Sequence, residues 1–227
     1  MKISFKEDEK DIAFVISEYP DEYKKILESQ FYSFKDENFV KKYPKNIDNI
    51  EKVKDNFKNY AEEMFLQMGY FKEVKWEETL LSFIDKVKAY DIDWWLTGSC
   101  ALCVRGIPIL PHDVDIMLNS KDIDKIKSIF SDYIVEPITS SKGWVVDYFG
   151  VLFLNARIDL AFDPQEFVDK PEPSDFGLYA MNNIETIKWN SKIVRVPPLE
   201  LQLQVNRRRK RYDRVKAIED HLNKNSR

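Results

Sequence analysis

The chain has 227 residues, 44% of them hydrophobic and 14% aromatic, which suffices for one large domain or for a catalytic domain with an appendage. Charged residues make up 33%, but the two signs are interleaved and the net charge is only -4, which excludes a disordered chain and a uniformly basic nucleic-acid-binding protein. No apolar run is long enough to cross a membrane, and the first residues, MKISFKEDEKD, lack the apolar core of a secretion signal. We therefore expect a cytoplasmic protein without membrane contact.

Residues 1–75 are expected to form a helical N-terminal extension. Apolar side chains recur at helical spacing in 20–34 and again in 47–68, and the stretch YPKN between them is a break. Pro20 and Asp21 form a helix start signal. The composition of this extension indicates no particular chemistry.

Residues 76–227 are expected to form a second unit, in which helices and strands alternate. In chain order we expect a helix at 76–90, a buried strand at 91–97, a helix at 98–106, a loop at 107–112, a strand at 113–118 and a helix at 120–133 with Ser120 as its N-cap. Next come strands at 144–150 and 151–162 that meet near Gly150 as a hairpin, a second hairpin of 184–189 and 192–197 around Asn190 and Ser191, and a helical tail at 198–222 that breaks near Tyr212. The pattern predicts an α/β (α+β) fold in which flanking helices cover a small mixed sheet.

Three aspartates in two of these strands are the candidate chemical centre. Asp113 and Asp115 are two positions apart, so they project from the same face of their strand, while Val114 and Ile116 face the core. Carboxylates this close repel one another unless a positive charge lies between them, and hard oxygen ligands suit Mg²⁺. Asp159 has the same apolar setting in a later strand, and the three would converge if the two strands are neighbours. Such a cluster can hold two metal ions.

Gly98 and Ser99 are the candidate phosphate-binding turn. They stand between a strand and a helix, where backbone N–H groups and the positive end of a helix dipole meet. Glycine permits close approach of the backbone to a ligand, and the Ser99 hydroxyl adds a donor. A triphosphate is the ligand that fits this arrangement.

Cys100 and Cys103, the two cysteines of the chain, form a CxxC pattern. A redox pair is one interpretation, since thiols near a helix start can have a lowered pKa. The other is that both are small apolar residues of a helix packed under the preceding strand, which is the commoner case for free cysteine. Zinc is the weakest interpretation, because no further Cys or His pair completes four ligands.

The order of these motifs resembles the nucleotidyltransferase superfamily, which has the polymerase-beta-like fold. Its pattern of apolar strand, Gly-Ser, helix, Asp-x-Asp and later acidic residue is matched by Gly98, Ser99, Asp113, Asp115 and Asp159. The stretch GSCALCVRGIPILPHDVDI is most similar to small bacterial and archaeal members, including antibiotic nucleotidyltransferases and related toxin-antitoxin enzymes, and the resemblance spans about 80–222.

The resemblance implies Mg²⁺-dependent transfer of a nucleoside monophosphate from a nucleoside triphosphate to an acceptor hydroxyl, with release of pyrophosphate. Asp113 and Asp115 would hold the metal, and Asp159 would ligate a second ion or take the acceptor's proton. Where many relatives carry a tail lysine, this chain has Asn206 followed by Arg207, so Arg207 is the candidate phosphate contact in the basic run NRRRKRYDR. The alternative for that run is a solvated helix face.

Other polar residues near these motifs have weaker claims. His112 and Arg105 could contact a phosphate or simply complete the local structure, and Arg157 is placed to form an ion pair with Asp159. Asp147 is the alternative third carboxylate if the hairpin register differs, and Asp163 is expected to end its strand.

Aromatic residues frame the same region. Trp94 and Trp95 are expected to pack in the core rather than to stack on a base. The aromatics of WVVDYFG, residues 144–150, could border an acceptor pocket.

The acceptor itself has three alternatives at this stage. A small molecule, such as an aminoglycoside-like compound, is the first hypothesis, because the chain is acidic overall. The second is RNA or a protein, as in a toxin or tRNA-modifying enzyme, with the basic run as the RNA track. The third is a non-catalytic nucleotide-binding module, against which the intact acidic trio argues.

Overall fold

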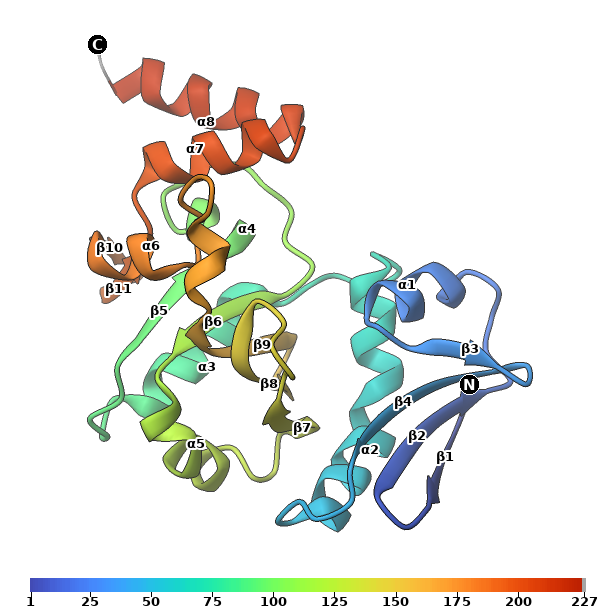
Figure 1. Ribbon diagram of the computed structural model, residues 1–227. Coiled ribbons are helices and arrows are strands. Elements are labelled where there is room, and N and C mark those ends of the chain that lie inside the picture. The colour runs from blue at the N-terminus through green and yellow to red at the C-terminus, as the bar shows by residue number, and fades with distance from the viewer. Residues whose placement is uncertain (226–227) are drawn as a thin grey trace.

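The computed structural model describes residues 1–225, and its first part is a small sheet with two helices (Figure 1). Four antiparallel strands in the order β1-β2-β4-β3 form the sheet. The elements are β1 (Lys2–Glu7), β2 (Asp11–Ser17), α1 (Tyr23–Ser29), β3 (Ser33–Lys35), β4 (Asn38–Pro44) and α2 (Ile50–Met68). The two helices fall within the segments expected to be helical, but a wholly helical N-terminal extension is wrong.

Strand β2 shows why this part is a sheet. It lies between β1 and β4, and its side chains Ile12, Phe14 and Ile16 are fully buried. Phe14 makes an edge-to-face contact with Phe57 of α2, whose ring centroid is 5.0 Å away. The sheet therefore buries one face against α2, which in turn packs on strand β7 of the second part. A division of the chain at residue 75 stays a prediction.

The second part is built on a five-stranded mixed sheet in the order β5-β6-β9-β8-β7. Strands β6 and β9 are parallel, and the other neighbours are antiparallel. The strands are β5 (Trp94–Thr97), β6 (Val114–Leu118), β7 (Ile134–Ser140), β8 (Val146–Phe153) and β9 (Arg157–Pro164). Helices α3 (Trp76–Val87) and α5 (Ile123–Ile129) pack on the sheet together with α2, and the expected small mixed sheet with flanking helices is confirmed.

The C-terminal elements complete this part: two of the helices pack on the opposite face of the sheet, and the hairpin lies beside β5. They are α6 (Leu178–Asn182), the hairpin β10 (Glu185–Trp189) and β11 (Lys192–Val196), α7 (Leu199–Arg208) and α8 (Tyr212–Asn225). Leu201 and Val205 of α7 pack on Trp95 and Met117, and the short helix α4 (Gly98–Cys103) lies beneath α7 and α8 (Figure 1). Single 3-10 turns, η1 (Ser120–Asp122) and η2 (Glu166–Asp169), complete the described elements. The expected tail break near Tyr212 is confirmed.

Two local expectations are wrong. Strand β8 continues through Gly150, where a Cβ would lie 2.5 Å from Cγ1 of Ile138 on β7, so this glycine permits strand contact rather than a turn. The β8–β9 turn lies at 154–156 instead. The side chain of Asn119, not Ser120, caps the helix that follows β6, since it accepts from the N–H of Lys121 at 3.0 Å. Within the described residues, no helix has the length and apolarity to cross a membrane.

Candidate active site

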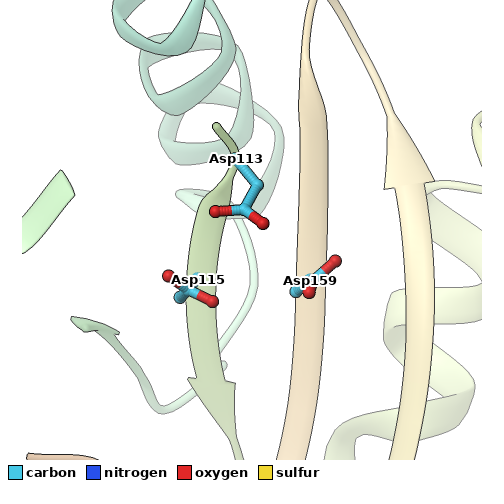
Figure 2. Close-up of side chains that lie close together, drawn as sticks. All are labelled: Asp113, Asp115 and Asp159. Carbon is cyan, nitrogen blue, oxygen red and sulfur yellow. The ribbon is translucent and has the colours of Figure 1, made fainter. Parts of the chain in front are cut away.

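Asp113, Asp115 and Asp159 converge at one end of the parallel strand pair (Figure 2). Asp113 immediately precedes β6, Asp115 lies within it, and the β6–β9 register places Asp115 directly beside Asp159. Each residue offers a carboxylate oxygen, and these oxygens all lie within 4.8 Å of one another. The expected convergence is confirmed, because the strand of Asp159, β9, is the hydrogen-bonded neighbour of β6.

The trio carries strong mutual repulsion. Burial, and then the charge of Asp159, raise the pKa of Asp113 to about 7. Burial also raises the pKa of Asp115, with the charges of Asp113 and Asp159 as further causes. A bound cation would replace this repulsion by attraction, and three carboxylates form the hard-oxygen donor set that Mg²⁺ prefers.

Arg157 compensates part of this negative charge from within the protein. Its side chain is 2% exposed, and its Nε donates to Oδ1 of Asp159 at 2.5 Å. The pairing expected from strand alternation is thus confirmed. Burial opposes the charge of Arg157, but Asp159 and then Glu136 raise its pKa, so the guanidinium stays charged. The ion pair fixes the direction of the Asp159 carboxylate.

Position 98 requires glycine because its backbone lies against the carboxylate of Asp115. It has a φ of 64°, in the left-handed region that favours glycine, and a Cβ at this position would lie 1.9 Å from Oδ2 of Asp115. The turn therefore brings the backbone against a carboxylate with no room for a side chain. Ser99 is buried beside it at the start of α4, where the first backbone N–H groups have no partner within the helix.

A cavity of about 500 Å³ opens over the trio, and its two sides differ in chemistry. On the β5–β6 side it is bounded by Gly98, Ser99 and the C-terminal arginines, and on the β8 side by aromatic and aliphatic side chains. The residues of the β5–β6 side are Thr97, Gly98, Ser99, Asp175, Arg209, Arg211 and Arg214. Those of the β8 side and the floor include Met117, Trp144, Val145, Val146, Phe149 and Ala161. The expectation that aromatics of 144–150 border the pocket is confirmed for Trp144 and Phe149.

The basic run contributes different arginines from the one expected. Arg207 does not line the cavity, and its Nη2 pairs with Oε1 of Glu219 at 2.6 Å, so its choice as phosphate contact is corrected. The chain turns at Lys210, which has a φ of 55°, and this turn directs Arg211 and Arg214 to the cavity. Burial and the like charges of Arg214 and Arg209 lower the pKa of Arg211. Such crowded cations favour a polyanionic ligand.

Asp175 is a cavity residue that the sequence did not indicate. It is 4% exposed, and burial raises its pKa, although Arg209 lies 3.9 Å away. The hydroxyl of Thr97 donates to the backbone carbonyl of Asp175 at 2.7 Å and ties this loop to β5. Asp175 lies in a loop without strand or helix periodicity, so only the fold reveals its position.

The weaker candidates have mostly structural surroundings. His112 lines the cavity, but its Nδ1 lies 3.1 Å from the carbonyl oxygen of Met68, and burial lowers its pKa. Asp147 is exposed and accepts from Gln165, while Asp163 accepts from the backbone N–H of Ser120 at 3.2 Å. Neither belongs to the acidic trio.

Arg105 and the two tryptophans also have structural partners. Arg105 pairs with Glu185 and the carbonyl of Pro197. Trp94 packs edge-to-face on Phe83, and Trp95 is buried in the core, as expected.

The two cysteines are free and lie on α4. Sγ of Cys100 lies 3.2 Å from the backbone carbonyl of Asp113, and Sγ of Cys103 lies 3.1 Å from that of Ile109. Burial raises the pKa of both thiols, that of Cys103 to about 11. A high pKa keeps a thiol protonated and unreactive, so the packing interpretation is favoured over the redox one.

Comparison with known proteins agrees with this geometry. The model of a family described as aminoglycoside-2''-adenylyltransferase matches residues 79–148, which hold the Gly98–Ser99 turn, Asp113 and Asp115. The resemblance to nucleotidyltransferases seen in the sequence is thereby confirmed over these residues.

Two solved structures match part of this chain. One is a Thermotoga maritima protein provisionally named a nucleotidyltransferase, with 20% identity, a TM-score of 0.49, and coverage of 65% of this chain and 92% of that one. The other is the lincosamide antibiotic adenylyltransferase LnuA with bound lincomycin, with 13% identity, a TM-score of 0.48, and coverage of 65% and 98%. No curated protein matches the chain.

Proposed function

We propose that the protein transfers a nucleoside monophosphate from a nucleoside triphosphate to a hydroxyl group of a small molecule, releasing pyrophosphate. The observation that carries this proposal is the convergence of three carboxylates within 4.8 Å in a cavity that arginines also line. Carboxylates bind a divalent cation, and arginines bind phosphate oxygens, so together they form a site for a metal-bound triphosphate.

Asp113 and Asp115 are the residues that would hold Mg²⁺, and the oxygen donor set fits that ion. When bound, such an ion neutralises charge on the phosphates and on the attacking and leaving oxygens. Gly98 and Ser99 present backbone and hydroxyl donors to the outer phosphates, and Arg211 and Arg214 neutralise them from the same side of the cavity.

Asp159 lies on β9, the strand of the trio that pairs with β8. One of its oxygens accepts from Arg157, and the other is available to the cation or to the proton of the acceptor hydroxyl. Arg157 is a positioning residue, because it holds this carboxylate in one direction without lining the cavity itself. The acceptor then enters from the β8 side, beside Trp144 and Phe149.

A small acceptor is favoured over RNA by the pairing of the basic run. Arg207, Arg208 and Arg209 have acidic partners in Glu219, Glu172 and Asp175. Paired arginines do not form the continuous free cationic track that phosphate-backbone binding needs. A purely binding module is disfavoured by the retention of all three carboxylates.

Pyrophosphate release from each of the four nucleoside triphosphates, measured with a panel of hydroxylated acceptors and with or without Mg²⁺, tests the proposal. We expect release that requires Mg²⁺ and is lost in Asp113→Asn. Release that persists in Asp113→Asn, or in a chelator, would contradict the assignment of the site.

A further inference from the structure

The N-terminal sheet and the edge of the central sheet enclose a second hollow of about 380 Å³. Phe31 and Lys41 line it from the N-terminal part, and Thr139, Trp144 and Phe149 line it from the central sheet. The segments that carry these side chains lie far apart in the sequence, and they meet where β4 contacts β7 and where Phe31 contacts Trp144. The hollow exists only because the N-terminal part is docked.

This hollow adjoins the active-site cavity. Trp144 and Phe149 line both spaces, so the two spaces meet at these side chains. Across the sheet, Met117 pairs with Ala161, Ala161 with Phe149, and Phe149 with Thr139. Directly paired residues face the same side of a sheet, and this row therefore forms one floor from the trio to the hollow.

Aromatic side chains stand exposed along that path. Trp144 is 43% exposed and Phe31 is 65% exposed, and their ring centroids are 5.4 Å apart at a steep angle. Phe149 contacts Trp144 edge-to-face at 5.7 Å. Phe31 has a φ of 63°, which is an uncommon backbone conformation for a residue with a side chain. Tertiary contacts, and not local backbone preference, therefore hold this conformation. Exposed rings arranged in this way bind planar ligands by stacking.

The charges of the hollow oppose a polycationic ligand. Its carboxylate, Glu136, is buried and neutralised by Lys41, whose Nζ lies 2.6 Å away, and it also accepts from the hydroxyl of Tyr32 at 3.0 Å. Lys42 and Lys142 also line the hollow, and Glu136 is the one acidic residue among its described lining. Lys42 is paired with Asp8 at 3.1 Å, so cationic amino groups would meet Lys142 and no unpaired carboxylate among this lining.

We infer that this hollow is the distal half of the acceptor site, and that the acceptor is an elongated hydroxylated molecule with a planar ring and a neutral or anionic far end. The inference rests on the proposed function for the position of the reacting hydroxyl. It gives the N-terminal part a role in acceptor selection, and it separates this chain from enzymes whose acceptors are polycationic.

The test measures binding of two probes to the full chain by saturation-transfer NMR. The first probe is 6-(hydroxymethyl)-2-naphthoate, which has a ring, a hydroxyl group and a carboxylate. The second is tobramycin, a polycationic hydroxylated compound without an aromatic ring. The variants are Trp144→Ala and Phe31→Ala, with Phe34→Ala as the matched control, since Phe34 is 58% exposed on the same N-terminal sheet and does not line the hollow.

We expect the naphthoate to bind more tightly than tobramycin. Its Kd should rise about tenfold in Trp144→Ala and roughly threefold in Phe31→Ala, the range expected for loss of aromatic contacts, and should stay unchanged in Phe34→Ala. Because Phe31 and Trp144 are exposed, circular dichroism should show all three variants folded.

The outcomes separate this inference from the proposed function. Tighter binding of tobramycin, no detectable binding of the naphthoate, or equal Kd values in Phe31→Ala and Phe34→Ala would overturn the inference. Thermal stabilisation by ATP with Mg²⁺ should be the same in Phe31→Ala, in Phe34→Ala and in the unmodified chain. Loss of that stabilisation in the unmodified chain, with naphthoate binding intact, would refute the proposed function and leave the ring-binding hollow standing.

Discussion

Replacement of Gly98 by alanine tests the contact between the turn and the trio. The new Cβ would stand 1.9 Å from Oδ2 and 2.9 Å from Cγ of Asp115, so the carboxylate has to move. The backbone φ of 64° adds a penalty of about 1–2 kcal/mol for any residue with a Cβ. Displacing the Asp115 side chain from its rotamer adds roughly 0.5–1.5 kcal/mol.

Gly106→Ala is the matched control for this variant. Gly106 has a φ of 81°, but nothing lies within 4 Å of the position of its Cβ. The control therefore carries the backbone penalty without the contact. The difference between the two variants should be about 1 kcal/mol, which corresponds to roughly 2–4 °C in Tm for a chain of this size.

The assay is thermal unfolding of both variants and the unmodified chain, with a chelator and with saturating Mg²⁺ and ATP. We expect the ligand-induced rise in Tm to survive in Gly106→Ala and to shrink in Gly98→Ala, because a tenfold loss of affinity removes about 1.4 kcal/mol of stabilisation. Equal Tm values and equal ligand-induced shifts in the two variants would refute the reasoning.

Three further predictions concern charge. In a chelator, Asp115→Asn should keep or raise the Tm because it relieves repulsion, whereas Asp159→Asn should lower stability by about 2–3 kcal/mol because a buried arginine loses its partner; equal shifts would contradict this. Arg214→Ala should raise the KM for the nucleotide about tenfold, and Arg207→Ala should change it less than twofold in steady-state assays. Burial alone would raise the pKa of Glu136, but two neighbouring cations hold it below 4.5, so its stabilisation is present above that pH and is lost as the pH falls further. Below about pH 5, the free energy of unfolding measured in urea should therefore vary less with pH in Glu136→Gln than in the unmodified chain.

The chemical centre could be predicted because its signal is local. The spacing of Asp113 and Asp115 fixes their common face, and the apolar neighbours of Asp159 indicate a strand that belongs beside theirs. Gly98 was recognised from its place between a strand and a helix. Its close contact with Asp115, however, is a tertiary fact, because it depends on how β5 pairs with β6.

The N-terminal sheet was missed because its turn signals are unusual. The β3–β4 hairpin turns at Asp36 and Glu37, which have φ values of 48° and 60°, where asparagine and glycine are the common residues. The hairpin at Asn190 and Ser191 has the same geometry, with φ values of 45° and 61°, and its asparagine made it recognisable. Gly150 predicts a turn in the sequence, but in the structure it allows close contact between β8 and β7.

The arginines of the tail show a third limit of sequence reasoning. A continuous helix through residues 206–214 would place Arg207 on one side with Arg211 and Arg214. The turn at Lys210 breaks that relation, so Arg207 pairs with Glu219 on α8 while Arg211 and Arg214 face the cavity. Lysine is not a residue type that indicates a positive φ, so this turn cannot be predicted from the sequence.

The central claim is that three carboxylates share a divalent cation. Titration with Mn²⁺, followed by its effect on water-proton relaxation, measures that binding directly on the folded chain in the presence of ATP. We predict saturable binding that weakens at least tenfold in Asp113→Asn and in Asp115→Asn, and that is unchanged in Asp147→Asn. Equal Mn²⁺ affinity in the unmodified chain and in Asp115→Asn would contradict the claim.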